Sequence, residues 1–235
     1  MCNNAESFAH LAEANLRGRK PMERVEVLNT GTSGYNFFNY LGTLDKFVEH
    51  SPTTLVIAVY GGNDYLGSVM PRHFFSGTAP QPRYEDYWTK LEAAKEASSA
   101  AVGMALNQAY YFQNYPDERE RARETALAVT AEIQRICKER GIELIWVYIP
   151  PLYDVDEAKT EEMSRAREVI GLSDYDMSVA DRLTDEVLEL ARAGGNSVID
   201  MRVEFRGRKG PFYWADGHIN LTSHRLIAEL LLPLL

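Results

Sequence analysis

Cysteine is scarce in this sequence, whose 235 residues include only Cys2 and Cys137. The two stand in no spacing typical of metal ligands, so the sequence predicts no metal site. Cys137 lies on the apolar side of a predicted helix, and we expect it to be a small buried hydrophobic residue.

Basic residues and long apolar runs are also in short supply. The formal net charge is −9, and no block rich in Lys or Arg stands out. Nucleic acids and acidic membranes bind basic surfaces, so neither is an expected partner. No apolar run approaches the roughly 20 residues of a membrane span. The start, "MCNNAESFAH", lacks the basic-then-apolar pattern of a signal peptide. We therefore expect a soluble chain, and the sequence assigns it to no compartment.

What the sequence does contain is an alternation of strand and helix patterns. Four apolar runs predict strands, and the second and third are continuous enough to be buried on both faces of a parallel sheet. The runs lie at 24–29, 53–60, 142–151 and 194–200, and helical patterns separate them. This order predicts a doubly wound, mostly parallel, flavodoxin-like α/β sheet with helices on both faces. At this length we expect a single domain over 1–235, with a helical insertion at about 66–115.

Three polar stretches follow strands or precede the last helix. They are "NTGTSGY" (29–35), "GGND" (61–64) and "WADGHIN" (214–220). Taken singly, each has an ordinary structural explanation: a glycine turn, an Asx cap, and a surface histidine. Ligands bind beyond the carboxyl ends of the strands in sheets of this kind, which is where we expect these stretches to lie.

Together the three stretches fit acyl transfer. That chemistry needs a base, an acid that orients the base, and donors aimed at the developing oxyanion. Asp216 and His218 can place a carboxylate against an imidazole, and the Gly34 N–H and the Asn63 amide can be the donors. Two glycines before Asn63 let its loop approach the reacting centre closely.

At these residues the sequence resembles the SGNH (GDSL-type) hydrolases, which are esterases and acylhydrolases on a flavodoxin-like sheet. The resemblance rests on "VEVLNTGTSGY", "VIAVYGGNDY" and "YWADGHINLTSHRLIAELL", in that order, and covers most of the chain. It implies that Gly34 and Asn63 build the oxyanion hole, that His218 is the general base and that Asp216 orients it. It implies no cofactor.

The chain departs from this family in three ways. Its acid lies two residues before the histidine rather than three, and the glycine often found near Ser223 is absent. The third departure is larger, because no Gly-Asp-Ser occurs in the 235 residues. Family members begin with a strand that ends in this nucleophile serine, whereas this chain begins at the helix that follows. Ser33 and Cys2 are poor replacements, so the nucleophile is unknown.

We therefore expect an N-terminally incomplete chain that lacks a central strand. The segments 24–29 and 53–60 should then flank a gap or pair directly. An exposed sheet edge would favour self-association into a homo-oligomer.

Two functions of different classes follow. The first is an ester hydrolase with a Ser-His-Asp mechanism, acting on acyl or acetyl esters, those of carbohydrates included. The second is a non-catalytic relative that binds a sugar or acyl group in the same cleft, with Tyr65, Tyr213 and Trp214 as stacking surfaces. Core or rim packing is the alternative explanation of these aromatic residues. A flavodoxin-like cofactor module is a third possibility, but the phosphate-binding loop that it needs is absent.

Overall fold

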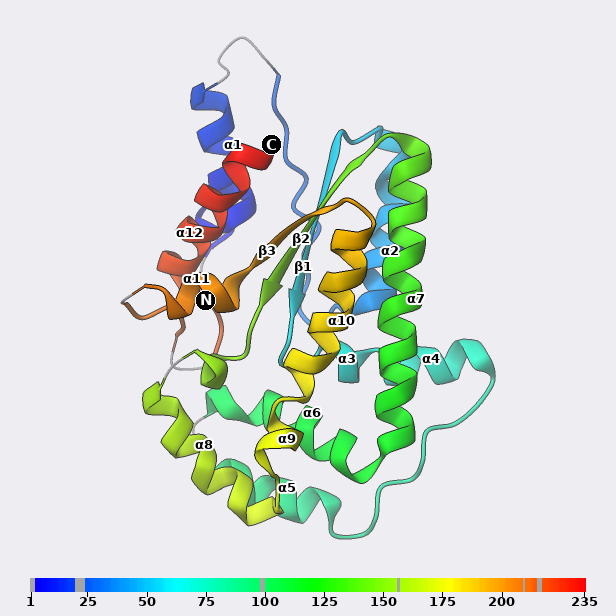
Figure 1. The fold of residues 1–235 in the computed structure, drawn as a ribbon, viewed down its shortest axis with the longest axis vertical. Helices are drawn as coiled ribbons and strands as arrows, with labels where there is room; N and C mark the ends of the chain where they lie inside the picture. Colours follow the sequence, from blue (N-terminus) through cyan, green and yellow to red (C-terminus); the bar gives the residue numbers. More distant parts are fainter. Residues whose placement is uncertain (1–2, 20–23, 98–99, 156, 209, 215–216) are drawn as a thin grey trace.

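The computed structural model describes residues 3–19, 24–97, 100–155, 157–208, 210–214 and 217–235 (Figure 1). It is a mixed α/β structure in which the described strands form one parallel sheet in the order β1-β2-β3. The strands are β1 (Thr54–Tyr60), β2 (Glu143–Ile149) and β3 (Ser197–Asp200). Three of the four predicted strands are therefore confirmed.

The central strand β2 shows why the sheet is covered on both faces. Every residue of β2 after Glu143 is buried. Alternate side chains point to opposite faces of a strand, and here they enter two separate hydrophobic clusters. Trp146 and Tyr148 belong to one cluster, and Ile145 and Val147 belong to the other. Both faces therefore pack against helices, as the continuous apolar pattern predicts.

Helices lie on either side of this sheet and below it (Figure 1). On one face lie α2 (Phe37–Phe47), α7 (Pro116–Arg140) and α10 (Val179–Ala193). On the other face lie α1 (Phe8–Arg19), α11 (Met201–Arg206) and α12 (Leu221–Leu231). No described helix combines the length and hydrophobicity that a membrane crossing requires.

The longest described helix, α7, has both of its ends marked in the sequence. Pro116 opens it, Asp117 and Glu118 lie in its first turn, and Gly141 ends it with a left-handed φ of 68°. Acidic residues near the start of a helix and glycine just past its end are each favourable there. Cys137, in its last turn, is buried as expected.

The remaining helices pack largely below the carboxyl ends of the strands (Figure 1). They are α3 (Asp64–Gly67), α4 (Val69–Ser76), α5 (Tyr87–Glu96), α6 (Ala100–Asn114), α8 (Glu157–Ile170) and α9 (Asp174–Met177). Short 3-10 turns occupy Asn4–Glu6, Val48–His50, Leu152–Asp154 and Leu232–Leu234. A tyrosine cluster, which includes Tyr87 stacked on Tyr110 at 5.0 Å, joins α5 to α6.

The strand predicted at 24–29 is wrong. Residues 24–30 form no strand, and the described ladder of β1 runs to β2 alone. Side chains hold this segment instead: Arg17 Nε donates to the Val25 carbonyl at 3.0 Å, and Asn29 Nδ2 donates to Asn4 Oδ1 at 3.0 Å. A β-rich run becomes a strand only when a neighbouring strand pairs with it. The segments 24–29 and 54–60 therefore do not pair with each other.

Candidate functional site

The turn after β1 is tightly packed by tyrosines of the sheet itself. The Gly61 N–H donates to the Ile149 carbonyl at 2.9 Å, which extends the ladder by one bond. A Cβ added to Gly61 would lie 2.1 Å from the Tyr148 hydroxyl, and one added to Gly62 would lie 2.4 Å from the Tyr60 ring. The close approach that the two glycines permit is thus to side chains of this chain.

Asp64 and Gln108 fasten the same turn to neighbouring helices. The buried Asp64 carboxylate accepts from the Tyr60 N–H at 2.7 Å and from the Tyr40 hydroxyl. Burial raises the pKa of Asp64 to about 7, although both hydrogen bonds oppose that shift. Gln108 donates to the Gly61 carbonyl at 2.7 Å, and its Oε1 accepts from the Leu66 N–H at 3.0 Å. Hydrogen bonds therefore fix the turn both to α2, through Tyr40, and to α6, through Gln108.

The two predicted oxyanion donors lie on adjoining segments. Asn63 is half-buried, and its Nδ2 lies 3.7 Å from the Met104 sulfur. Gly34 is exposed in a turn with a left-handed φ of 80°. Its neighbour Asn36 caps α2, and the Asn36 Cβ lies 3.2 Å from where a Cβ of Gly67 would be. The residue that follows the first polar stretch by one position therefore packs against α3, which begins at the last residue of the second stretch.

The third stretch forms a hairpin before α12. Tyr213 and Ile219 form an antiparallel bridge, and the Trp214 N–H donates to the His218 carbonyl at 2.7 Å. The Tyr213 hydroxyl donates to the Pro150 carbonyl at 2.5 Å, which ties the hairpin to the carboxyl end of β2. His218 is exposed on this hairpin, and Asp216 lies outside the described residues.

The turn after β1 and the hairpin before α12 both reach the carboxyl edge of the sheet, through the Ile149 and Pro150 carbonyls at the end of β2. Tyr60, the last residue of β1, packs against the cluster that contains Tyr213. The turn after β1 and the hairpin before α12 are therefore neighbours at this edge. The catalytic roles of Gly34, Asn63 and His218 stay predictions.

The aromatic residues expected to stack on a ligand differ in exposure. Tyr65 is fully buried, and its hydroxyl lies 2.8 Å from Thr184 Oγ1, so the expectation that it binds substrate is wrong. It follows Asp64 into α3, and the helix turns its ring into the core. Tyr213 is also buried, whereas Trp214 is 39% exposed. Trp214 alone of the three keeps a surface for a ligand.

A cluster of ion pairs surrounds Arg202 just after β3, and no sequence motif predicts it. Arg202, on α11, lies 2.7 Å from carboxylate oxygens of Asp200 and of Asp185, and 3.3 Å from one of Asp181. Burial and the negative charge of Asp181 raise the pKa of Asp154 to about 8. Both effects favour the protonated form of Asp154. The one signal in the sequence is that Asp200 closes a predicted strand.

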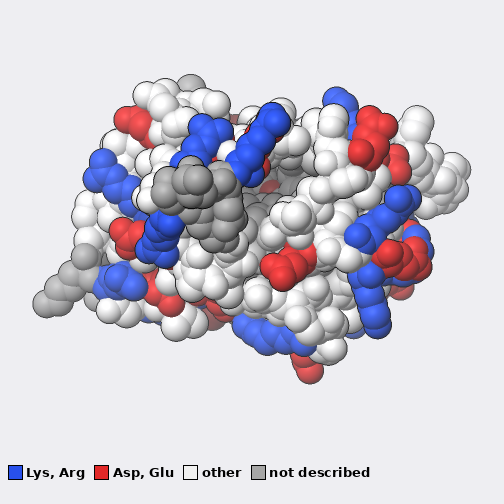
Figure 2. Space-filling model, turned by 90° about the horizontal axis from the view of Figure 1, so that it is seen from above, with Lys and Arg blue, Asp and Glu red and all other residues white. Residues whose placement is uncertain are grey.

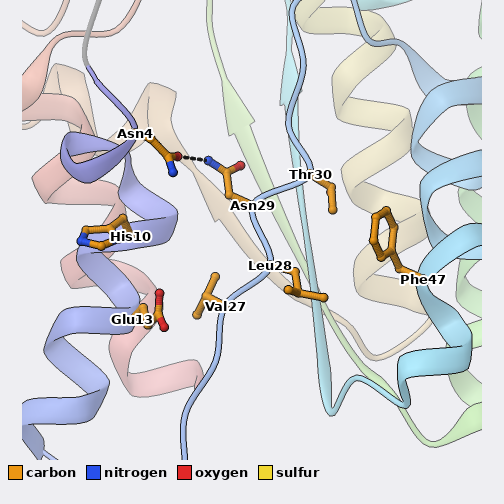
Figure 3. A pocket seen from close by; sticks show the side chains of 8 residues that line it. All are labelled: Asn4, His10, Glu13, Val27, Leu28, Asn29, Thr30 and Phe47. Carbon is orange, nitrogen blue, oxygen red and sulfur yellow. Dashed lines mark hydrogen bonds between the residues drawn. The ribbon is translucent and has the colours of Figure 1, made fainter.

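Two cavities lie beside the segment 24–30. Their volumes are about 270 and 340 Å³, and both are lined by Asn29, Thr30 and Phe47. Figure 3 shows His10 and Glu13 of α1 on one side of the first cavity and Phe47 of α2 on the other. Seen from above, the molecule is hollowed near its centre, with Lys and Arg side chains beside the hollow (Figure 2). Acidic side chains are interspersed with basic ones on this face, which shows no continuous basic patch.

No group of three or more His, Cys, Asp or Glu among the described residues could hold a metal ion. No family model, curated protein or solved structure matches this chain.

Proposed function

We propose that this chain belongs to an ester hydrolase of the SGNH type that cleaves acyl or acetyl esters. The observation that supports the proposal is that the turn after β1 and the hairpin before α12 are both tied to the carboxyl end of β2 in a parallel sheet. In open α/β sheets ligands bind at that edge. His218 is the general base, Asp216 orients it, and the Gly34 N–H and the Asn63 amide receive the oxyanion.

The arrangement of strands supports a flavodoxin-like, doubly wound sheet. In that fold the order of strands is 2-1-3-4-5. The observed order β1-β2-β3 fits its last three strands, and the unpaired segment 24–30 fits the second. We propose that a further strand lies between 24–30 and β1 and carries the nucleophile serine. No Gly-Asp-Ser occurs in the 235 residues, so this strand would come from outside them.

The proposed oxyanion donor Asn63 makes only a weak contact through its Nδ2 in this structure. The serine hydroxyl attacks the ester carbonyl and its proton passes to His218, while negative charge develops on the carbonyl oxygen. Asn63 Nδ2 now lies 3.7 Å from a methionine sulfur, which is a weak acceptor. An oxyanion is a far stronger acceptor, so the exchange of partners is favourable.

The test is to measure hydrolysis of short-chain aryl esters by two proteins. The 235-residue chain should be nearly inactive, because loss of a triad nucleophile costs on the order of 10⁶ in turnover. The same chain preceded by an apolar strand ending in Gly-Asp-Ser should be active. His218→Ala in the longer protein should abolish that activity, whereas His50→Ala, at an exposed histidine after α2, should not.

Two results would contradict the proposal. One is robust hydrolysis by the 235-residue chain that a serine reagent blocks, in which case Ser33 is the first residue to substitute. The other is activity in the longer protein that His218→Ala leaves intact.

The exposed Trp214 favours a second candidate, a non-catalytic relative that binds a carbohydrate or acyl group at this edge. Aromatic faces stack on sugar rings and on acyl chains. A longer protein that stays inactive, but whose Trp214 fluorescence responds to an acetylated sugar, would favour binding. Trp214→Ala should abolish this response, and Trp88→Ala, at a half-exposed tryptophan of α5, should leave it.

A further inference from the structure

A hydroxyl, an imidazole and a carboxylate outside the three polar stretches are linked by consecutive hydrogen bonds. Thr78 Oγ1 lies 2.7 Å from His73 Nδ1, and His73 Nε2 lies 2.8 Å from Glu118 Oε2. His73 belongs to α4, Thr78 follows that helix, and Glu118 lies in the first turn of α7. These are the three groups of nucleophilic catalysis, in the order in which they act.

Glu118, the carboxylate of this hydrogen-bonded group, is fixed in place by burial and by two further contacts. Glu118 is fully buried, and its Oε1 accepts from the Gln81 N–H at 3.3 Å and pairs with Arg121 Nη1 at 3.2 Å. His73 is 3% exposed. The Thr78 N–H donates to the His73 carbonyl at 3.0 Å, which fixes the backbone between them. The imidazole therefore has one orientation.

The position of the protons follows from these contacts. An ionised carboxylate can only accept, so beside ionised Glu118 the ring proton is on His73 Nε2. In the neutral imidazole Nδ1 then holds a lone pair and is the acceptor for the Thr78 hydroxyl. Thr78 itself is exposed. An exposed hydroxyl thus donates to a base whose tautomer a buried acid sets.

We propose that Thr78 is a nucleophile that takes an acyl group from an apolar ester, with His73 as its general base and Glu118 as the orienting carboxylate. Apolar surface on the same helix fits such an ester. Met70, Phe74 and Phe75 are 60%, 79% and 70% exposed. Large exposed apolar side chains that gather on one element mark a site of binding.

The step balances without a cofactor. The Thr78 Oγ1–acyl carbon bond forms and the ester C–O bond breaks. The hydroxyl proton passes to His73 Nδ1 and from there to the oxygen of the leaving alcohol. The imidazolium formed in between is stabilised by Glu118, which stays ionised. The product is an acyl ester of Thr78, formed once per chain.

The test is covalent labelling of the 235-residue chain with diisopropyl fluorophosphate, followed by peptide mapping. The Oγ1–P bond forms, the P–F bond breaks, fluoride leaves and His73 takes the proton. We expect one adduct, on Thr78. Absence of an adduct on Thr78, or an adduct at another residue alone, would overturn the proposal without the need for any variant.

Variants then separate catalysis from mere accessibility. Thr78→Val should lose the adduct completely, and Thr78→Ser should keep it. Glu118→Gln should slow labelling by roughly 10²-fold or more, because the base loses its orienting charge. Ser76→Ala is the matched control, since its exposed hydroxyl donates to the Arg72 carbonyl at 2.7 Å rather than to an imidazole, and labelling should be unchanged. Equal labelling rates in Glu118→Gln and the unaltered chain would refute the proposed relay, in which Glu118 orients His73 and His73 activates Thr78.

This inference is independent of the proposed function at the carboxyl edge. Thr78 labelling needs neither His218 nor an added strand. Hydrolysis by the longer protein can therefore fail while Thr78 labelling succeeds, and the reverse can also occur.

Discussion

Tyr148 decides which residues can follow β1. Its hydroxyl occupies the space where a side chain of Gly61 would begin, 2.1 Å from the position of a Cβ. Because Tyr148 is fully buried among its neighbours, the ring cannot swing away. The double glycine is therefore a packing requirement of the sheet, whatever ligand the edge binds.

We expect Gly61→Ala to destabilise the protein by about 1–3 kcal/mol, the usual cost of overpacking a core. The measurement is urea unfolding followed by circular dichroism. Gly42→Ala is the control, because nothing lies within 4 Å of its added Cβ in the middle of α2. That change should stabilise the protein by roughly 0.5–1 kcal/mol, as alanine favours a helix over glycine. Equal midpoints for both variants would show that Tyr148 yields to the extra atom.

At the scale of elements, the contrast between β1 and the segment 24–30 shows what a strand needs. Both are rich in β-branched residues, yet only β1 finds a partner, through a seven-residue register with β2. The segment 24–30 is held by contacts such as that from Arg17 to the Val25 carbonyl. Its Leu28 side chain is 53% exposed. Its conformation therefore depends on few interactions.

Amide hydrogen exchange should separate these elements. We expect the amides of 24–30 to exchange within the fast phase, because a backbone outside a ladder is protected only by local contacts. The amides of β2, which has a strand on each side, should exchange slowest. Mass spectrometry of peptides that cover 24–30 and 143–149 makes the comparison. Equal protection of the two peptides would mean that 24–30 pairs with a strand in solution.

At the scale of the whole molecule, buried carboxyl groups link stability to pH. Burial raises the pKa of Asp64 to about 7, and burial with the charge of Asp181 raises that of Asp154 to about 8. An unfolded aspartate titrates near pH 4, so between about pH 4 and pH 8 these two groups bind more protons in the folded protein than in the unfolded chain. By linkage, these two groups make the free energy of unfolding fall as the pH rises through this range.

Asp154→Asn should remove one of the two contributions to the fall in the free energy of unfolding with rising pH. We expect the variant to lose less stability than the unaltered chain between pH 5 and pH 8, because an amide takes no charge. Thermal melting at several pH values measures this difference. Asp45→Asn, at an exposed position of α2, is the control and should leave the dependence of the melting temperature on pH unchanged. A parallel pair of curves for Asp154→Asn and the unaltered chain would contradict the raised pKa.

The sequence by itself determined the parts of this protein that rest on local pattern. The continuous apolar run of β2 required burial on both faces, and the ends of α7 followed from Pro116 and Gly141. The place of "GGND" at the carboxyl edge also followed, because this stretch comes directly after the apolar run of β1.

Only the tertiary structure decided which groups meet across the chain. Residues 24–29 had a strand pattern, but pairing depends on a neighbour that no local pattern supplies. Tyr65 had the chemistry of a stacking surface, and the direction of α3 buried it. The relay from Thr78 to Glu118 joins residues 40 positions apart, through hydrogen bonds that exist only once α4 packs against α7. The physical reason is that side-chain contacts depend on how elements pack, whereas the elements themselves depend mainly on residues that are close in sequence.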